Sequence, residues 1–306
     1  MDIQVLIDQM LVLLLCMTIG FLAGRLKLLD ETACQRFSAL LVNVTNPAMI
    51  LYSVMEGEIT LTTMQVLLIL VISIAAHGAM YVIARLTPRL LRLPAKEWGV
   101  YQFMIMFGNV GFMGFPVVRA MFGPQAVFYA AVFTLPFNML TYTLGVKWVS
   151  QDGKAGKFNW KLLVGPNVIA SLITFGLYLI RIRLPGPIVT VTGMLADVTT
   201  PLAMLIIGSS LARMDVKSVL LDGKIYGMCA IRLLLFPMLL WFVVSRFQTD
   251  PLILGLVVVE AAMPVATAAT MLCVSYNGRE ETASKGVFVS TILSMVTIPF
   301  LMWLLF

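Results

Sequence analysis

The side chains able to do chemistry in this sequence stand singly within long apolar runs. His77, Arg232 and Glu260 are ionisable, and Asn109 carries an amide beside Gly108. The single histidine excludes a metal site built from several histidines, and the four cysteines are scattered along the chain. The sequence motifs of serine hydrolases, zinc proteases and phosphate-binding loops are absent. We therefore expect no catalytic residue, no resident metal and no cofactor, and neither an enzyme nor an ATP-driven machine.

Two uses are open for each of the three ionisable residues. Glu260 lies four residues before Pro264, about one helical turn. It is either a carboxylate that exchanges protons or a partner for Arg232. Arg232 either attracts an anion or pairs internally with an acid, which is the commoner use. His77 either relays protons or packs with a hydrogen bond, and packing is again commoner.

The composition is that of an integral membrane protein. Of 306 residues, 60% are hydrophobic and 12% are charged, whereas soluble domains are about 25% charged. The mean hydropathy is +0.97. The apolar residues form long uninterrupted runs, which favours helices over a barrel of short alternating strands. The net charge of +6 lies in short loops beside these runs, which does not suggest a nucleic-acid partner.

The apolar runs predict ten transmembrane helices of roughly 20 residues each. They cover about 4–24, 33–55, 63–86, 97–121, 125–148, 161–181, 187–211, 218–245, 251–275 and 284–305. Of the 21 Lys and Arg residues, 16 lie at the odd-numbered loops, four lie at the opposite side, and Arg232 lies within a helix. The positive-inside rule then places the odd-numbered loops in the cytoplasm and both termini outside, in a multi-pass protein of the plasma membrane, the cell inner membrane.

The two halves of the chain resemble each other. Residues 43–49, NVTNPAM, align with residues 197–204, DVTTPLAM, and two further pairs of segments align in the same order. Five helices per half give the second half the opposite orientation, so we expect inverted repeats over 1–148 and 161–306 around a cytoplasmic linker at 149–160. Asn43, a candidate substrate-binding residue, is then the partner of Asp197. Asp197 either binds a proton or cation, or caps a proline-interrupted turn as Asn43 would.

The fourth predicted helix of each half carries a breaking point. These are GNVGFMGFP at 108–116 and EAAMP at 260–264. Backbone groups freed inside a membrane need partners in protein or water, so such breaks line a cavity. We expect two broken helices that meet as a crossover, with helix N-termini suited to an anion and free carbonyls suited to a cation. The expected substrate-binding residues there are Gly108, Asn109, Val110, Met263, Pro264 and Val265. Close packing at glycine and a simple kink at proline are the alternative.

GNVGFMGFPVVRAMFG at 108–123, AAMP at 261–264 and the ten-helix length resemble the auxin efflux carrier family, the bacterial relatives of the plant PIN-FORMED exporters. The resemblance implies the fold of bile-acid symporters and sodium/proton antiporters. In that fold helices 1, 2, 6 and 7 form a scaffold, and helices 3–5 and 8–10 form a moving transport domain. It also implies a homodimer and carboxylate substrates, either auxin-like or malonate- and malate-like. The plant crossovers pair proline with an amide, whereas here Val265 follows Pro264 and only Asn109 matches.

These observations favour a secondary active or facilitative carrier of small organic anions that works by alternating access of an elevator or rocking type. Its partners would be the anion and the lipid bilayer. Export of an anion needs no coupled ion at an inside-negative potential, whereas uptake would need H+ or Na+, with Asp197 or Glu260 to bind it. A sodium- or proton-coupled exchanger of the same fold is the alternative, and a paired set of acids at the crossover would favour it. The third hypothesis is a channel or a non-transporting sensor. A sensor would be favoured by an appended signalling domain, and the sequence shows none.

Overall fold

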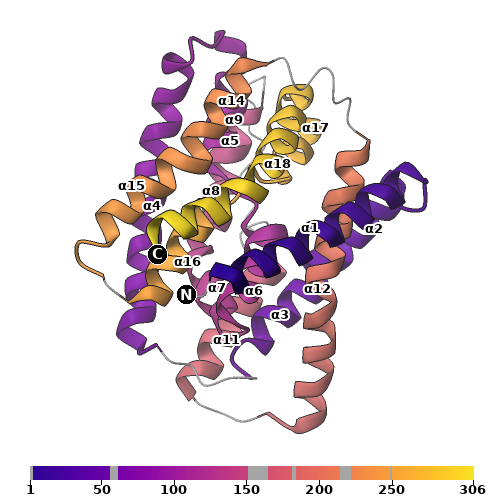
Figure 1. Cartoon of the computed structure of the whole chain (residues 1–306), viewed down its shortest axis with the longest axis vertical. Helices are drawn as coiled ribbons and strands as arrows, with labels where there is room; N and C mark the ends of the chain where they lie inside the picture. The colour runs from indigo at the N-terminus through magenta and orange to yellow at the C-terminus, as the bar shows by residue number, and fades with distance from the viewer. Residues whose placement is uncertain (1–2, 56–60, 151–164, 181–183, 214–221, 249) are drawn as a thin grey trace. The chain divides into compact units, whose positions relative to one another are not determined.

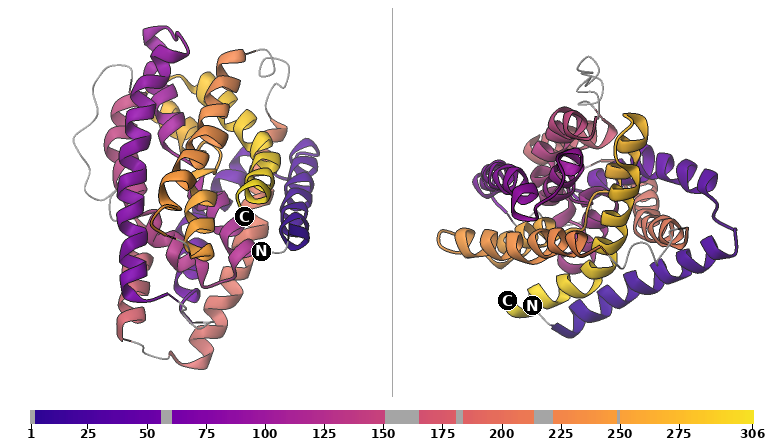
Figure 2. Two further views of the ribbon diagram at one scale, coloured as in Figure 1. Left: turned by 60° about the vertical axis from the view of Figure 1, so that its left-hand side comes forward. Right: turned by 90° about the horizontal axis from the view of Figure 1, so that it is seen from above.

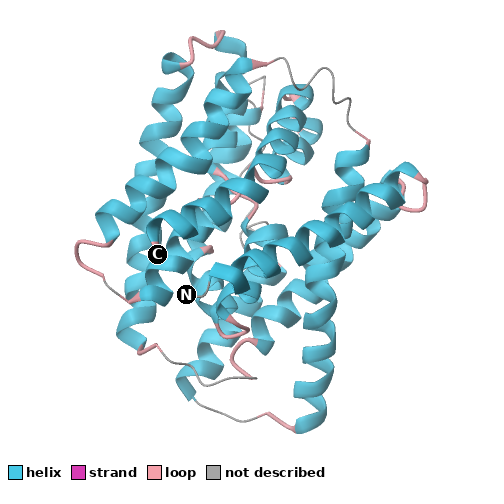
Figure 3. Cartoon of the chain, in the orientation of Figure 1, coloured by secondary structure: helices cyan, strands magenta, loops and turns pink. Residues whose placement is uncertain are grey.

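The computed structural model describes residues 3–55, 61–150, 165–180, 184–213, 222–248 and 250–306, and every element in these ranges is a helix (Figure 3). The expected all-helical class is therefore confirmed. In chain order the elements are α1 Ile3–Arg25, α2 Glu31–Leu40, η1 Leu41–Thr45, α3 Asn46–Tyr52, α4 Thr63–Leu90, η2 Ala95–Glu97, α5 Trp98–Met106, η3 Val110–Gly114, α6 Phe115–Phe122, α7 Ala126–Phe133, α8 Leu135–Leu140, η4 Thr141–Gly145, α9 Val146–Val149, α11 Pro166–Ile180, α12 Gly186–Ala212, α14 Gly223–Ala230, η5 Ile231–Leu235, α15 Phe236–Val244, α16 Pro251–Ala261, α17 Ala268–Ser275 and α18 Glu280–Leu305.

Six helical stretches in the described part of the chain are long and apolar enough to cross a membrane. They are Ile7–Arg25, Thr63–Leu90, Ala126–Val149, Gly186–Ala212, Gly223–Val244 and Glu280–Leu305. Shorter apolar helices lie at Val110–Phe122, Pro166–Ile180 and Pro251–Ala261. The chain is an integral membrane protein by these lengths. The longest uninterrupted stretch, α4, appears as a single purple rod in the left view of Figure 2.

In the described residues four five-residue π-helical segments interrupt the α-helices, and in three of them a single residue separates the end of the segment from a proline. The prolines are Pro47, Pro116 and Pro237, each within the first two positions of the next α-helix. Proline lacks an N–H, so the carbonyl four residues before it loses its usual donor. That carbonyl belongs to the middle residue of each π-helix: Asn43, Phe112 and Leu233. The missing donor favours a π-turn at these three places. It does not produce one by itself, because α12 and α18 pass through Pro201 and Pro299 without a π-turn and no proline follows η4 in α9.

The chain divides into two compact units, and the first comprises residues 1–68, 111–132 and 164–214. In this unit α1 packs against α12, and α12 and α11 both pack against α3 (Figure 1). Two glycines bring α1 and α12 into backbone contact. A Cβ on Gly20 would collide with the carbonyl of Leu205, and a Cβ on Gly208 with the carbonyl of Met17. Small residues at such crossings are the usual way for helices to approach closely in a membrane.

The second unit comprises residues 69–110, 133–163 and 215–306. In it α18 packs against α5, α14, η5 and α17, while α15 packs against α16. Its centre is densely apolar: Phe103 and Phe107 are fully buried, with ring centroids 4.7 Å apart. Most of the expected linker at 149–160 belongs to this unit by sequence but lies outside the described residues.

Candidate functional site

The first break lies between α5 and η3. The α-helix ends at Met106, and Phe107 adopts an extended conformation with φ −108° and ψ 115°. Gly108 and Asn109 continue the non-helical stretch until η3 begins at Val110. Asn109 is 3% exposed. The chain therefore leaves the helix inside the protein, where every freed backbone group needs a partner.

The second break lies between α16 and α17. The first helix ends at Ala261, and the second begins at Ala268. Pro264 and Val265 stand between them in a buried, non-helical stretch. Proline has no N–H to continue the helical bonding, so the interruption follows from the residue type.

The two breaks bond to each other through their backbones. The N–H of Asn109 donates to the carbonyl of Pro264 at 2.8 Å, and the N–H of Ala266 donates to the carbonyl of Phe107 at 3.0 Å. Gly108 and Val265 thereby form an isolated antiparallel bridge. The remaining N–H of Val265 donates to Ser290 Oγ of α18 at 3.0 Å. Backbone groups freed in each helix are thus satisfied by the other helix and by α18.

Arg232 of η5 links the ends of both first half-helices. Its Nε donates to the carbonyl of Met263 at 3.0 Å, and its Nη1 donates to the carbonyl of Ile105. Ile105 is in the last turn of α5, and Met263 follows the end of α16. A cation is favourable at a helix C-terminus, where unpaired carbonyls carry partial negative charge. One guanidinium therefore caps two broken helices, although it is only 2% exposed.

The position of Arg232 leaves no room for a side chain at Gly108. A Cβ at position 108 would collide with Arg232 Nη2 and lie 3.4 Å from the Cβ of Met263. Because the guanidinium is already held by two carbonyls, it has little freedom to retreat. Glycine at 108 is therefore needed for space as well as for breaking the helix.

A small cavity of about 30 Å³ adjoins the breaks. Its volume suits one or two water molecules. The lining residues are Ala76, His77, Met80, Met106, Gly108, Val110, Phe133, Phe137, Arg232, Phe236, Glu260 and Ala261. Three of the expected site residues with ionisable side chains, His77, Arg232 and Glu260, thus face one cavity.

Glu260 does not form the expected ion pair with Arg232. The structure records no salt bridge between them within 4.0 Å in the described residues, and both carboxyl oxygens lack a hydrogen-bond partner there. The physical reason is that the guanidinium is turned toward the carbonyls of Ile105 and Met263. Glu260 is 1% exposed, so it stands as a buried acid beside the cavity.

His77 lies on α4 and is partly buried. Its Nδ1 donates to the carbonyl of Ser73 at 2.8 Å, and the Ser73 hydroxyl donates to the carbonyl of Phe133. A carbonyl only accepts, so the proton of the neutral ring sits on Nδ1 and Nε2 is left as an acceptor.

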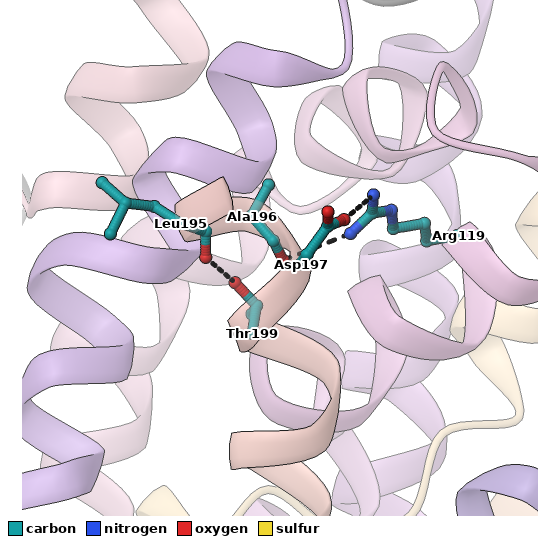
Figure 4. A network of polar contacts seen from close by, with 5 residues as sticks. All are labelled: Arg119, Leu195, Ala196, Asp197 and Thr199. Carbon is teal, nitrogen blue, oxygen red and sulfur yellow. Dashed lines mark hydrogen bonds and ion pairs between the residues drawn. The ribbon is translucent and has the colours of Figure 1, made fainter. Parts of the chain in front are cut away.

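Asp197 belongs to the first unit. Arg119 of α6 reaches Asp197 Oδ1 at 2.6 Å and the carbonyl of Ala196 at 3.2 Å (Figure 4). The side chain of Asp197 is 69% exposed. The expectation that it caps a proline-interrupted turn is wrong, because α12 runs unbroken from Gly186 to Ala212 through Pro201.

Asn43 is exposed, and its amide donates to the carbonyl of Ala39 at 2.7 Å, within its own helical stretch. Nor does it cap a turn, since the helical chain continues through η1 into α3. Sequence reasoning missed Asn46, which is 1% exposed and donates to the carbonyl of Gly111 at 3.2 Å. The available signal was an amide directly before Pro47 inside an apolar run. Ser290 was also missed, because a serine on a buried helix carries no sequence mark of its partner.

A family model described as a membrane transport protein matches residues 5–159 and 154–302. An "Uncharacterized transporter" of Methanothermobacter thermautotrophicus is 26% identical over 299 residues, which cover 95% of this chain and 96% of that protein. "Uncharacterized transporter YfdV" of Escherichia coli K12 is 21% identical over 302 residues, covering 96% of this chain and 95% of that protein. A protein of Rhizobium meliloti named "Putative malonate transporter" is 22% identical over 225 residues, covering 71% of this chain and 70% of that protein.

Proposed function

Because the chain belongs to the membrane transport protein family, the auxin efflux carriers, we propose that it moves small organic carboxylate anions across the cell membrane. It is a multi-pass membrane transport protein. The anion site is the pair of bonded breaks at Gly108–Asn109 and Pro264–Val265. The single observation that carries the proposal is Arg232, a buried guanidinium held at both breaks.

The chemistry around the breaks suits an anion better than a free cation. Arg232 already takes the carbonyls of Ile105 and Met263, which a metal cation would otherwise use as oxygen ligands. The second half-helices begin beside the breaks, at Val110 and Ala268, and helix N-termini favour negative charge. The relative from Rhizobium meliloti, named for malonate, supports a dicarboxylate as the first substrate to test.

We further propose that the ten predicted helices form two inverted five-helix repeats and that the site is exposed to each side in turn. Antiparallel pairing of two broken helices at corresponding places in the two halves supports this arrangement. The scaffold would come from helices 1, 2, 6 and 7, and the moving domain from helices 3–5 and 8–10, by an elevator or rocking motion. The compact units at 1–68, 111–132 and 164–214, and at 69–110, 133–163 and 215–306, are compatible with such a division of most of these helices.

The alternative is a sodium- or proton-coupled exchanger whose main cargo is the cation. Glu260, buried beside the cavity, is the observation that favours it. It is less well supported than anion transport, because Arg232 stands in the same cavity and repels a second cation.

The test is charge movement in proteoliposomes after rapid addition of malonate, malate or indole-3-acetate. We expect saturable currents for at least one acid, and none in liposomes without protein. Currents from sodium or proton jumps alone, with no response to any acid, would support the exchanger instead.

Asn109→Ala tests the site within the same assay. We expect its half-saturating concentration to rise about tenfold or more, since a hydrogen bond to a charged group contributes about 1.5–3 kcal/mol. Asn138→Ala is the matched control, because the Asn138 amide donates to the carbonyl of Thr134 in its own helical stretch. Equal affinities for the two variants would remove Asn109 from the site.

A further inference from the structure

Of the three ionisable side chains that line the cavity, Arg232 and His77 are held by hydrogen bonds, and Glu260 is not. It is 1% exposed, and neither carboxyl oxygen has a hydrogen-bond partner in the described part of the chain. An ionised carboxylate in that position would be buried without compensation, which is strongly unfavourable in a membrane protein. A protonated carboxyl avoids most of that penalty. The state in the structure is therefore the one expected when Glu260 carries a proton.

The charged and titratable groups around Glu260 are few. From η5 comes Arg232, and from α4 comes His77. The other elements at the cavity contribute apolar or small residues: Met106 from α5, Phe137 from α8 and Phe236 from α15. Arg232 and His77 are thus the ionisable residues that share this cavity with Glu260 in the described part of the chain, and the Nε2 of His77 is left as an acceptor.

Two kinds of acceptor compete for the guanidinium of Arg232: the backbone carbonyls that it contacts, and an ionised Glu260. In the structure it holds the carbonyls of Ile105 and Met263, and its Nη2 lies against Gly108 at the cavity. A carboxylate attracts a guanidinium more strongly than a carbonyl does. Loss of the proton from Glu260 would therefore draw Arg232 away from at least one helix end. That movement would loosen the pairing of the two breaks.

We propose that Glu260 is the proton-binding site through which this carrier couples anion movement to a proton, with Arg232 as the group that transmits the change. The proposal deepens the proposed function and rests on it. A proton from water on one side binds a carboxylate oxygen of Glu260, and the same proton returns to water on the other side. The guanidinium already occupies the carbonyls, so sodium is not the coupling ion. His77, partly buried at the same cavity, is the other titratable residue of its described lining besides Arg232.

The first test needs no substrate. The melting temperature of the purified protein, followed by the fluorescence of its five tryptophans, is measured between about pH 6 and pH 9. In the wild type it should fall as pH rises, because the unfolded chain releases the proton of Glu260 freely whereas the folded chain must keep it or bury a charge. Glu260→Gln should lose that part of the dependence.

Glu281→Gln is the matched control. Glu281 is 81% exposed and pairs with Lys285 at 2.5 Å, so its amide variant should keep the wild-type dependence on pH. Should Glu260→Gln fail to fold, Glu260→Met offers an apolar side chain of similar size. If the Glu260 variants follow the wild type as closely as Glu281→Gln does, Glu260 exchanges no proton in this range and the proposal is wrong.

The second test measures coupling. Proteoliposomes held at zero membrane potential take up labelled malonate down an inward proton gradient. One coupled proton gives about tenfold accumulation for each unit of pH difference. Glu260→Gln should reduce the accumulation to that of protein-free liposomes with the same gradient, while Glu281→Gln should keep it. Sodium should change neither result.

The outcomes separate the two proposals. Malonate exchange without any effect of the proton gradient would overturn the proton site and leave the anion carrier standing. A wild type that moves no carboxylate, but whose melting temperature depends on Glu260, would overturn the carrier and keep proton binding. Gradient-driven accumulation in Glu260→Gln equal to the wild type would assign coupling to another residue.

Discussion

At the level of single residues, Gly108 and Gly111 differ in what a side chain would meet. A Cβ at 108 would collide with Arg232 Nη2, whereas at 111 the nearest atom is Asn46 Nδ2 at 3.8 Å. We expect Gly108→Ala to displace the guanidinium from a buried carbonyl. Each carbonyl left unpaired costs about 1–3 kcal/mol. The melting temperature should therefore fall by several degrees, and malonate transport should fall with it.

Gly111→Ala is the matched control, three residues further along the chain in η3. An ordinary van der Waals contact leaves its stability near that of the wild type. If the two alanine variants melted at the same temperature, Arg232 would have room to move, and its position would not depend on glycine.

Asp197 differs from Gly108, because its exposed position predicts that a substitution there has little effect on stability or transport. Its pair with Arg119 is largely exposed on the Asp197 side, and exposed pairs contribute about 0–1 kcal/mol. We expect Asp197→Asn to lower stability by no more than that amount. It should also leave proton-driven malonate accumulation unchanged in the proteoliposome assay. Loss of accumulation in Asp197→Asn, with Glu260→Gln unaffected, would transfer the coupling role to Asp197.

At the level of elements, Pro237 sets the position of Arg232. It deprives the carbonyl of Leu233 of its usual donor in η5, the π-helix that carries the arginine. Pro237→Ala restores an N–H and favours an ordinary α-turn. Relaxing the π-turn would rotate Arg232 by about one residue, roughly 100°. The guanidinium could then no longer reach both carbonyls, so stability and malonate transport should both fall.

Pro299→Ala is the control for this prediction, because α18 passes through Pro299 as one α-helix from Glu280 to Leu305. It gains an N–H without removing a π-turn, so its melting temperature should equal or exceed that of the wild type. Equal losses in both variants would show that proline, and not the π-turn, is what the carrier needs.

The sequence predicted helix interruptions where the cause is local. Gly108 and Pro264 break their helices through their own backbone chemistry, and both breaks lie at those residues in the structure. The π-turns were not predictable from proline alone, because Pro237 follows one whereas Pro299 lies inside an unbroken α-helix. The partners of Arg232 were not predictable. An arginine and two carbonyls distant in sequence meet only through tertiary packing, and the sequence favoured an acid as its partner.

At the level of the whole molecule, the charge distribution predicts the orientation of the chain. The odd-numbered loops and their margins hold 16 of the 21 Lys and Arg residues. Retaining these cations in the cytoplasm leaves both termini outside when the number of spans is even. The described C-terminal helix α18, which ends at Leu305, would then point its end out of the cell. The same parity underlies the proposed inverted repeats, because five spans per half reverse the second half.

Reporter fusions to Phe306 in a bacterial host test this orientation. Alkaline phosphatase folds into an active enzyme outside the cytoplasm, where its disulfides form, whereas green fluorescent protein matures when it remains inside. We expect an active phosphatase fusion and a dark fluorescent fusion. A fluorescent C-terminus would mean an odd number of spans or the reverse orientation. The same fusions at the N-terminus separate these two cases. Both termini inside would refute only the orientation given by the charge count. An N-terminus outside with a C-terminus inside would mean an odd number of spans, which cannot be divided into two five-helix halves and would overturn the inverted repeat.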